Sequence, residues 1–172
     1  DGIIENMIDL QRVLNQPRKY SGNPVHKPEE AWEWFHGTSV LYDEEEHIYK
    51  MWHGVQKGNN MQSGSLGYAT SKDGVHWERP KLGLFEWGGT KENNVVFRSL
   101  MWSTYGVIKD THETDPAKRY KALFHFCTED MLDMGYDQPV CAAYSPDGIH
   151  WNPSLHRNPV IWSGTDVVGF GF

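Results

Sequence analysis

The sequence predicts an all-β fold, and three observations support this prediction. First, a seven-residue segment occurs twice: residues 71–77 read SKDGVHW and residues 145–151 read SPDGIHW. Second, runs rich in Val, Tyr and Trp, bounded by Gly, Asn and Asp, surround both copies, as expected for short strands joined by turns. Third, the same further motifs accompany each copy in the same order. We therefore expect two copies of one β-sheet unit.

The repeat extends well beyond the seven-residue segment. An offset of 74 residues places Trp77 on Trp151, and it also places residues 68–71 (YATS) on residues 142–145 (AAYS). Upstream, the matching segments are 49–52 with 120–123, and 39–43 with 106–110. An Asn-x-Val element occurs three times, at Asn23, Asn94 and Asn158. Because separate elements keep their order, chance similarity is a poor explanation.

Each copy is predicted to form a four-stranded antiparallel meander. In the first copy the strands are expected at residues 38–42, 48–55 and 66–71 and from residue 75 onward. The Asp-Gly pair before the last strand predicts a hairpin turn, because glycine adopts positive φ at little cost. The tryptophan after each turn is expected to pack between neighbouring sheets. At residues 4–14 a short helix and an extended segment fit the sequence about equally well.

Repeated four-stranded sheets usually pack radially around an axis, so the fold class predicted is the β-propeller. Residues 1–172 then form one partial domain: an N-terminal extension (1–25), a first blade (26–97), a second blade (98–162) and the start of a third (163–172). A closed ring needs at least four blades. We therefore expect either that these residues are the N-terminal portion of a longer, five-bladed propeller, or that chains associate to close the ring.

Composition excludes some classes of partner. The formal net charge is −7 and no run of Lys or Arg occurs, which argues against nucleic acid and anionic membranes as partners. No apolar run approaches the roughly 20 residues of a membrane-spanning helix. Residues 43–46 (DEEE) are expected to form a solvated hairpin tip. Cys127 and Cys141 flank a strand-loop-strand, which permits a disulfide bridge or two buried thiols. Nothing in the sequence distinguishes a secreted, periplasmic or cytoplasmic location.

No cofactor or metal is predicted. The nine histidines include no pair with the spacing of metal ligands, and the chain has no phosphate loop, dinucleotide fingerprint or nucleophile elbow.

The motifs resemble those of the five-bladed β-propeller glycoside hydrolases, the superfamily that includes families 32 and 43. The resemblance is strongest to proteins described as similar to the family 32 N-terminal domain, and it covers nearly the whole chain after about residue 20. The segments that carry it are 23–25 (NPV), 32–33 (WE), 49–52 (YKMW), 68–80 (YATSKDGVHWERP), 82–84 (LGL) and 93–96 (NNVV).

The resemblance implies hydrolysis of a glycosidic bond in the central funnel of the propeller, with a carbohydrate as partner. This chemistry needs two carboxyl groups, one as proton donor and one as base or nucleophile. In this family the acids lie where the inner strands begin. Asp166 and Glu33 are the candidates for catalytic carboxyl groups. Five further residues are candidates for sugar binding, because they lie at the predicted strand starts or edges: Trp34, His36, Trp102, Tyr105 and His125.

The chain also departs from the family at an important place. The first inner strand of such enzymes often begins with an acidic motif, whereas the matching position here holds His36 or Gly37. Two functions therefore stay open: a glycoside hydrolase, and a carbohydrate-binding or scaffolding propeller without catalysis. For each candidate aromatic or histidine residue, packing within the blade is an alternative role.

Overall fold

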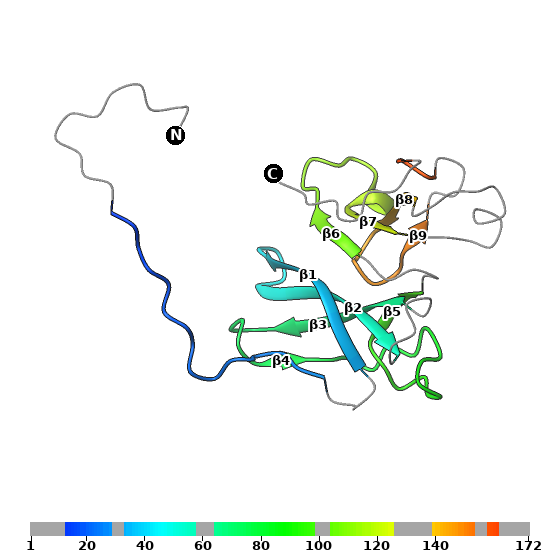
Figure 1. The fold of residues 1–172 in the computed structure, drawn as a ribbon. Coiled ribbons are helices and arrows are strands. Elements are labelled where there is room, and N and C mark those ends of the chain that lie inside the picture. Colours follow the sequence, from blue (N-terminus) through cyan, green and yellow to red (C-terminus); the bar gives the residue numbers. More distant parts are fainter. Residues whose placement is uncertain are drawn as a thin grey trace, which may run out of the picture.

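The computed structural model describes residues 13–28, 33–57, 64–98, 104–125, 139–153 and 158–161. The described part is all-β, as the sequence predicts, and its only helix is one 3₁₀ turn, η1 (Pro116–Lys118). The strands form two antiparallel sheets, one above the other (Figure 1). Each sheet contains a four-stranded meander, which is the arrangement of a propeller blade.

The first sheet contains five strands. In chain order they are β1 (Glu33–Asp43), β2 (Ile48–Lys57), β3 (Gly64–Ser71), β4 (Trp77–Glu78) and β5 (Val95–Arg98). The order across the sheet is β1-β2-β3-β4, and β5 pairs with β3 as well. β1 to β3 are longer than their sequence patterns suggest, and β1 begins earlier in the chain.

The second sheet repeats this meander with β6 (Thr104–Lys109), β7 (Tyr120–His125), β8 (Val140–Ser145) and β9 (Asn152–Pro153), in the order β6-β7-β8-β9. The registers agree with the sequence repeat. Tyr49 lies opposite Ser71 in the first sheet, as Tyr120 lies opposite Ser145 in the second. Equivalent residues of the two copies therefore occupy equivalent positions in their sheets.

The edge of β3 is covered by two short strands instead of one long strand. β4 pairs with the end of β3 at Thr70 and Ser71, and β5 pairs with its beginning, where Ser65 lies opposite Arg98. Between them, Asn94 donates from Nδ2 to the Tyr68 carbonyl over 2.7 Å. The Asn-x-Val element thus fixes the point at which the chain returns to the sheet.

The second sheet has the same anchor. Asn158 donates from Nδ2 to the Ala142 carbonyl over 3.0 Å, and its Oδ1 accepts from the Ala142 amide over 2.8 Å. Ile161 then forms a β-bridge with Val140. Because Ala142 is the register equivalent of Tyr68, both asparagines anchor the chain at the same position of the third strand.

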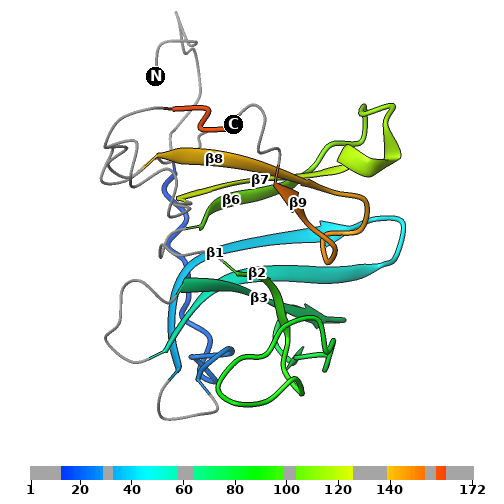
Figure 2. The same cartoon turned by 90° about the vertical axis from the view of Figure 1, so that its right-hand side faces the viewer.

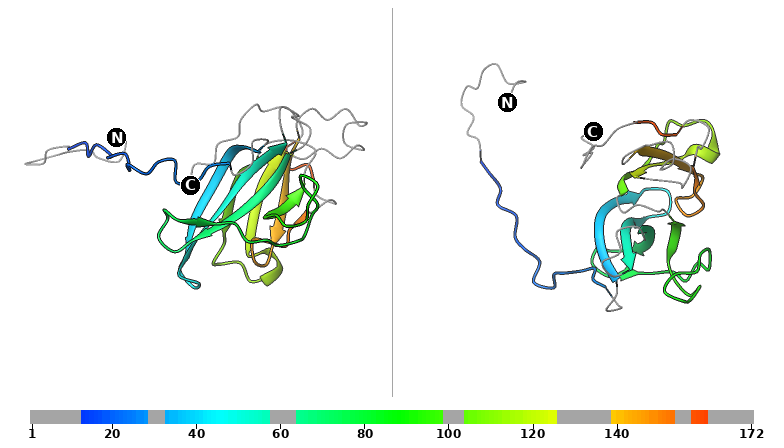
Figure 3. Two further views of the ribbon diagram at one scale, coloured as in Figure 1. Left: turned by 90° about the horizontal axis from the view of Figure 1, so that it is seen from below. Right: turned by 45° about the vertical axis from the view of Figure 1, so that its right-hand side comes forward.

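The main core cluster lies between the two sheets, and five of its buried residues are aromatic. Trp52 lies 5.5 Å from Tyr68 and 5.9 Å from Tyr120 between ring centroids, and Phe97 lies 4.8 Å from Phe124. All five are buried. Aromatic side chains bury large areas and stabilise further through tilted ring contacts. The interface therefore holds the sheets together face to face (Figure 3).

Each Asp-Gly hairpin is stabilised by its own side chains. In the second copy, the Asp147 carboxylate accepts from the amides of Ile149 and His150, both over 2.8 Å. In the first copy, the Asp73 carboxylate accepts from the amides of Val75 and His76 over the same distances. Local sequence alone therefore determines the shape of this turn.

Some predictions fall outside the described residues. These are the start of a third blade at residues 163–172, Cys127, and most of the helix or extended segment at residues 4–14. Cys141 is buried in β8. Within the described ranges, no helix has the length and apolar character needed to cross a membrane.

Candidate functional site

The two inner strands, β1 and β6, lie side by side and run in the same direction. Near their middles, the Val107 amide donates to Ser39 Oγ over 2.9 Å. Further along both strands, Lys109 Nζ donates to Asp43 Oδ1 over 2.7 Å. Residue numbers increase along both strands from the first contact to the second. The strands therefore run parallel and begin at the same end of the molecule. Figure 2 shows β1 and β6 as neighbours, with the β1–β2 and β6–β7 connections at the opposite end.

The end at which β1 and β6 begin is here called the opening end. Glu33, Trp34 and His36 lie in the first part of β1, and Tyr105 lies in the first part of β6. His125 is the last residue of β7, which runs antiparallel to β6, so its backbone also lies at the opening end.

The backbone thus brings five of the candidate residues to one end of the two sheets, while the structure does not describe their side chains. Asp166 and Trp102 lie outside the described residues. The catalytic and sugar-binding roles of all seven therefore stay predictions.

Both inner strands carry a bulge close to the opening end. The register of β1 shifts between His36 and Thr38, and that of β6 shifts between Thr104 and Gly106. A bulge re-aims the side chains beside it and is frequent next to binding sites. The extra residues are Gly37 and Tyr105, so the second bulge involves one of the predicted sugar-binding residues.

A cluster of charged groups lies at the other end of β1, and the sequence reasoning missed it. Residues 43–46 do form the tip of the β1–β2 hairpin, and Glu44 to Glu46 are exposed, but Asp43 is fully buried. Its Oδ2 lies 2.9 Å from Lys50 Nζ and accepts from the Tyr120 hydroxyl over 2.7 Å. Its Oδ1 accepts from Lys109 Nζ. Lys50 is also buried. Asp43, Lys50, Lys109 and Tyr120, together called the ionic joint, therefore connect the two sheets within their interface.

Burial alone would raise the pKa of Asp43. The hydrogen bonds from Lys109, Lys50 and Tyr120 outweigh it, and the pKa of this carboxyl group lies well below its usual range. Burial raises the pKa of the Tyr120 hydroxyl, which therefore stays protonated. Asp43 is thus a carboxylate and Tyr120 a neutral donor at neutral pH. Because each group is held in one protonation state and excluded from water, the joint is suited to structure and not to proton transfer.

One signal in the sequence points to this joint. Lys50 lies two residues before Trp52 in a strand, so both side chains face the same side of the sheet. A lysine on the core side of a strand requires a buried acidic partner, and Asp43, at the end of the neighbouring strand, is the nearest candidate.

Among the described residues, no group of three or more His, Cys, Asp or Glu side chains could hold a metal ion.

These features define a class: an all-β protein made of blade-like sheets, with the inner strands side by side and their starts at one end. No protein-family model matches the sequence, and the search of curated proteins found no match. Among solved structures, the chain is similar to the crystal structure of fructan 1-exohydrolase IIa from Cichorium intybus in complex with 1-kestose. The identity is 16%, the TM-score is 0.44, and the match covers 85% of this chain. The chain spans only 25% of the length of that structure.

Proposed function

We propose that this chain supplies two neighbouring blades of a β-propeller that hydrolyses glycosidic bonds in an oligosaccharide or polysaccharide. The observation that carries the proposal is the common direction of β1 and β6, which places the starts of both inner strands at the opening end. Propeller glycosidases carry out their chemistry at this position, and the motifs quoted above resemble theirs. The described geometry also supports blade-like packing of the two sheets.

In this proposal Glu33 and Asp166 supply the two carboxyl groups. One donates a proton to the leaving oxygen, and the other activates water or attacks the sugar. Trp34, Trp102 and Tyr105 offer flat faces to the sugar ring, and His36 and His125 offer hydrogen bonds, as is usual for a sugar pocket. Further blades of the same propeller complete the funnel.

The proposal is tested by a release assay on the natural full-length protein, with a panel of polysaccharides and aryl glycosides. With an active substrate, Glu33→Gln and Asp166→Asn should each lower kcat by at least about 100-fold, because general acid–base catalysis contributes factors of about 10²–10⁴. Glu44→Gln is the matched control, because Glu44 is exposed at the other end of β1. Normal turnover in both site variants would contradict these assignments.

A second candidate function is carbohydrate binding without catalysis. It is favoured by one observation: the position at which related enzymes often carry an acidic residue is matched in this sequence by His36 or Gly37. The same panel distinguishes the two functions. Saturable binding of a polysaccharide, measured by calorimetry, without any released sugar would support the binding function over hydrolysis.

A further inference from the structure

The second sheet repeats the part of the ionic joint that the first sheet supplies, namely one lysine with two carboxylates. In the first sheet, Lys50 Nζ lies 2.9 Å from Asp43 and 2.6 Å from Glu46. In the second sheet, Lys121 Nζ lies 2.6 Å from Asp110 Oδ2 and 2.9 Å from Glu113 Oε2. Both copies therefore pair one lysine with an Asp and with a Glu three residues further on.

The backbone confirms that the two copies are equivalent. Lys50 lies opposite Leu41 and Thr70, as Lys121 lies opposite Ile108 and Tyr144. In each copy the Asp also accepts from the amide two residues later, over 3.1 Å at Asp43 and 3.0 Å at Asp110.

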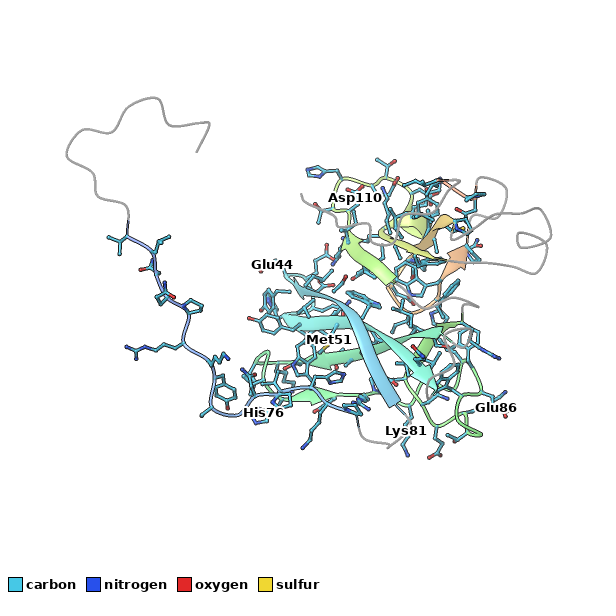
Figure 4. All side chains as sticks on the ribbon, viewed as in Figure 1. Glu44, Met51, His76, Lys81, Glu86 and Asp110 are labelled. Carbon is cyan, nitrogen blue, oxygen red and sulfur yellow. The ribbon has the colours of Figure 1, made fainter. Side chains whose placement is uncertain are left out.

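The copies differ in what covers them. The second sheet covers the first copy and adds Lys109 and Tyr120 to Asp43, which is 0% exposed, while Lys50 is 2% exposed. In the second copy, by contrast, the side chains of Lys121 and Asp110 are 30% and 29% exposed. Figure 4 shows Asp110 on the upper sheet, above the hairpin that carries Glu44. Two carboxylates around one lysine leave this second copy with an excess of negative charge.

An open hollow of about 930 Å³ lies beside the second copy, and Lys121 contributes to its wall. Leu123, Ala142 and Tyr144 line it from the second sheet. The equivalent residues of the first sheet show what such a surface packs against. Leu123 and Ala142 are the equivalents of Trp52 and Tyr68, which the second sheet covers in the first sheet. One wall of the hollow is therefore the face of the second sheet that corresponds to the covered face of the first. The rest of the wall includes Ser39 to Tyr42 of β1 and the edge strand β6.

We propose that this face of the second sheet docks the next sheet of the same propeller, and that this sheet donates a tyrosine hydroxyl and a lysine ammonium to Asp110. The inference rests on the propeller architecture of the proposed function.

The proposed interface with the next sheet differs in one respect from the interface between the two described sheets. Arg119 of the second sheet contacts Glu45 of the first, whereas the residue equivalent to Glu45 is His112. An arginine at the matching position of the next sheet is therefore not required.

Lysine acetylation of the natural full-length protein, followed by mass spectrometry, tests the docking without any substitution. Lys81 is the matched control, because it is 69% exposed and lies 2.7 Å from Glu92, so it also carries an ion pair. Lys50 provides the fully covered reference. We expect Lys121 to react at least tenfold more slowly than Lys81, at every protein concentration. A smaller difference overturns the proposal, and protection that disappears on dilution overturns it in favour of a second copy of the chain.

A second measurement excludes protection that arises only from the ion pairs of Lys121. Hydroxyl-radical oxidation of Tyr144, which lines the hollow, is compared with that of Tyr20, which is 52% exposed. Docking should slow the oxidation of Tyr144 at least fivefold relative to Tyr20, and a smaller ratio overturns the proposal. Neither measurement depends on turnover. An inactive protein with a protected Lys121 would therefore refute the hydrolase function alone, and an active protein with a reactive Lys121 would refute the docking alone.

Discussion

The two copies of the repeat make the same internal bonds in different surroundings. In the hairpins, the Trp77 and Trp151 indole nitrogens donate to Gly74 and Gly148 over 3.1 and 3.0 Å. The second hairpin also contacts the other sheet, because the Gly148 carbonyl accepts from Trp52 Nε1 over 2.7 Å.

The ionic joint shows the opposite arrangement. Within the described residues, its copy in the first sheet is covered by the other sheet, whereas the copy in the second sheet is partly exposed. Each sheet therefore contributes one repeated element to their interface: Asp43 and Lys50 from the first, and the Gly148 hairpin from the second. The local bonds therefore follow from the repeated sequence, whereas the contacts between sheets depend on where each copy lies in the chain.

The largest loss of stability is expected at the ionic joint. Asp43→Asn leaves Lys50 and Lys109 without their buried counter-ion, and breaking a buried ion pair costs about 3–5 kcal/mol of unfolding free energy. Urea denaturation at neutral pH measures the loss. Glu44→Gln, at the exposed neighbour, is the control and should change stability by less than about 0.5 kcal/mol. Equal effects of the two substitutions would show that the joint contributes nothing to stability.

The stability of the wild-type protein and of Asp43→Asn should also depend differently on pH. The pKa of Asp43 is lowered in the folded state, so its contribution is present above the unfolded pKa of about 3.9 and is lost as the pH falls below that value. The wild-type protein should therefore lose stability more steeply than Asp43→Asn between about pH 4 and pH 2. Parallel acid titrations of the two proteins would contradict the assignment.

Gly148→Ala is the next largest effect. Its φ of +79° is unfavourable for alanine, and an added Cβ would lie 2.6 Å from Trp52 Cζ2. We expect a loss of about 3 kcal/mol, from backbone strain of about 1–2 kcal/mol and crowding of about 1–3 kcal/mol. Gly83→Ala is the matched control, with a φ of +71° and no atom within 4 Å of the added Cβ. It should lose only the backbone contribution. Equal losses, measured by urea denaturation, would rule out crowding by Trp52.

A smaller effect is expected for Trp52→Phe, which removes the hydrogen bond to the Gly148 carbonyl and part of the core. The carbonyl keeps its bond from Trp151, so the loss should be about 1–2 kcal/mol. The smaller ring also makes room at Gly148. Gly148→Ala should therefore cost less in the Trp52→Phe background, as a double-mutant cycle measures. Strict additivity would mean that the two residues do not interact across the interface.

The smallest effect tests the part that both copies share. Asp73→Ala and Asp147→Ala each remove two side-chain bonds to the backbone of their own hairpin, which is comparable to the loss of a helix cap and costs about 1 kcal/mol. The two losses, measured by thermal unfolding, should agree within about 0.5 kcal/mol. A clear difference would show that the hairpin network depends on its surroundings and would weaken the comparison.

The sequence predicted the repeated meander well, because strand alternation and Asp-Gly turns are local properties. It did not predict that β4 and β5 share one edge of β3, since such pairing depends on where a distant segment returns. For the site, the sequence placed Tyr105 near a strand start, whereas Glu33 lies in β1 because that strand begins earlier than its pattern suggests. The roles of both residues stay predictions. The buried state of Asp43 was missed, because residues 43–46 look like a solvated turn until the second sheet supplies Lys109 and Tyr120.

The shared edge of β3 has a consequence for how such a chain can change its length. The segment between β4 and β5 (residues 79–94) leaves the sheet and returns to the same strand at Asn94, and its shorter counterpart in the second sheet returns at Asn158. Residues can therefore be gained or lost in this excursion without moving any paired strand. This explains why the two hairpins are 74 residues apart while Asn94 and Asn158 are only 64 apart. A search for a fixed period would overlook relatives that differ only in the length of this excursion.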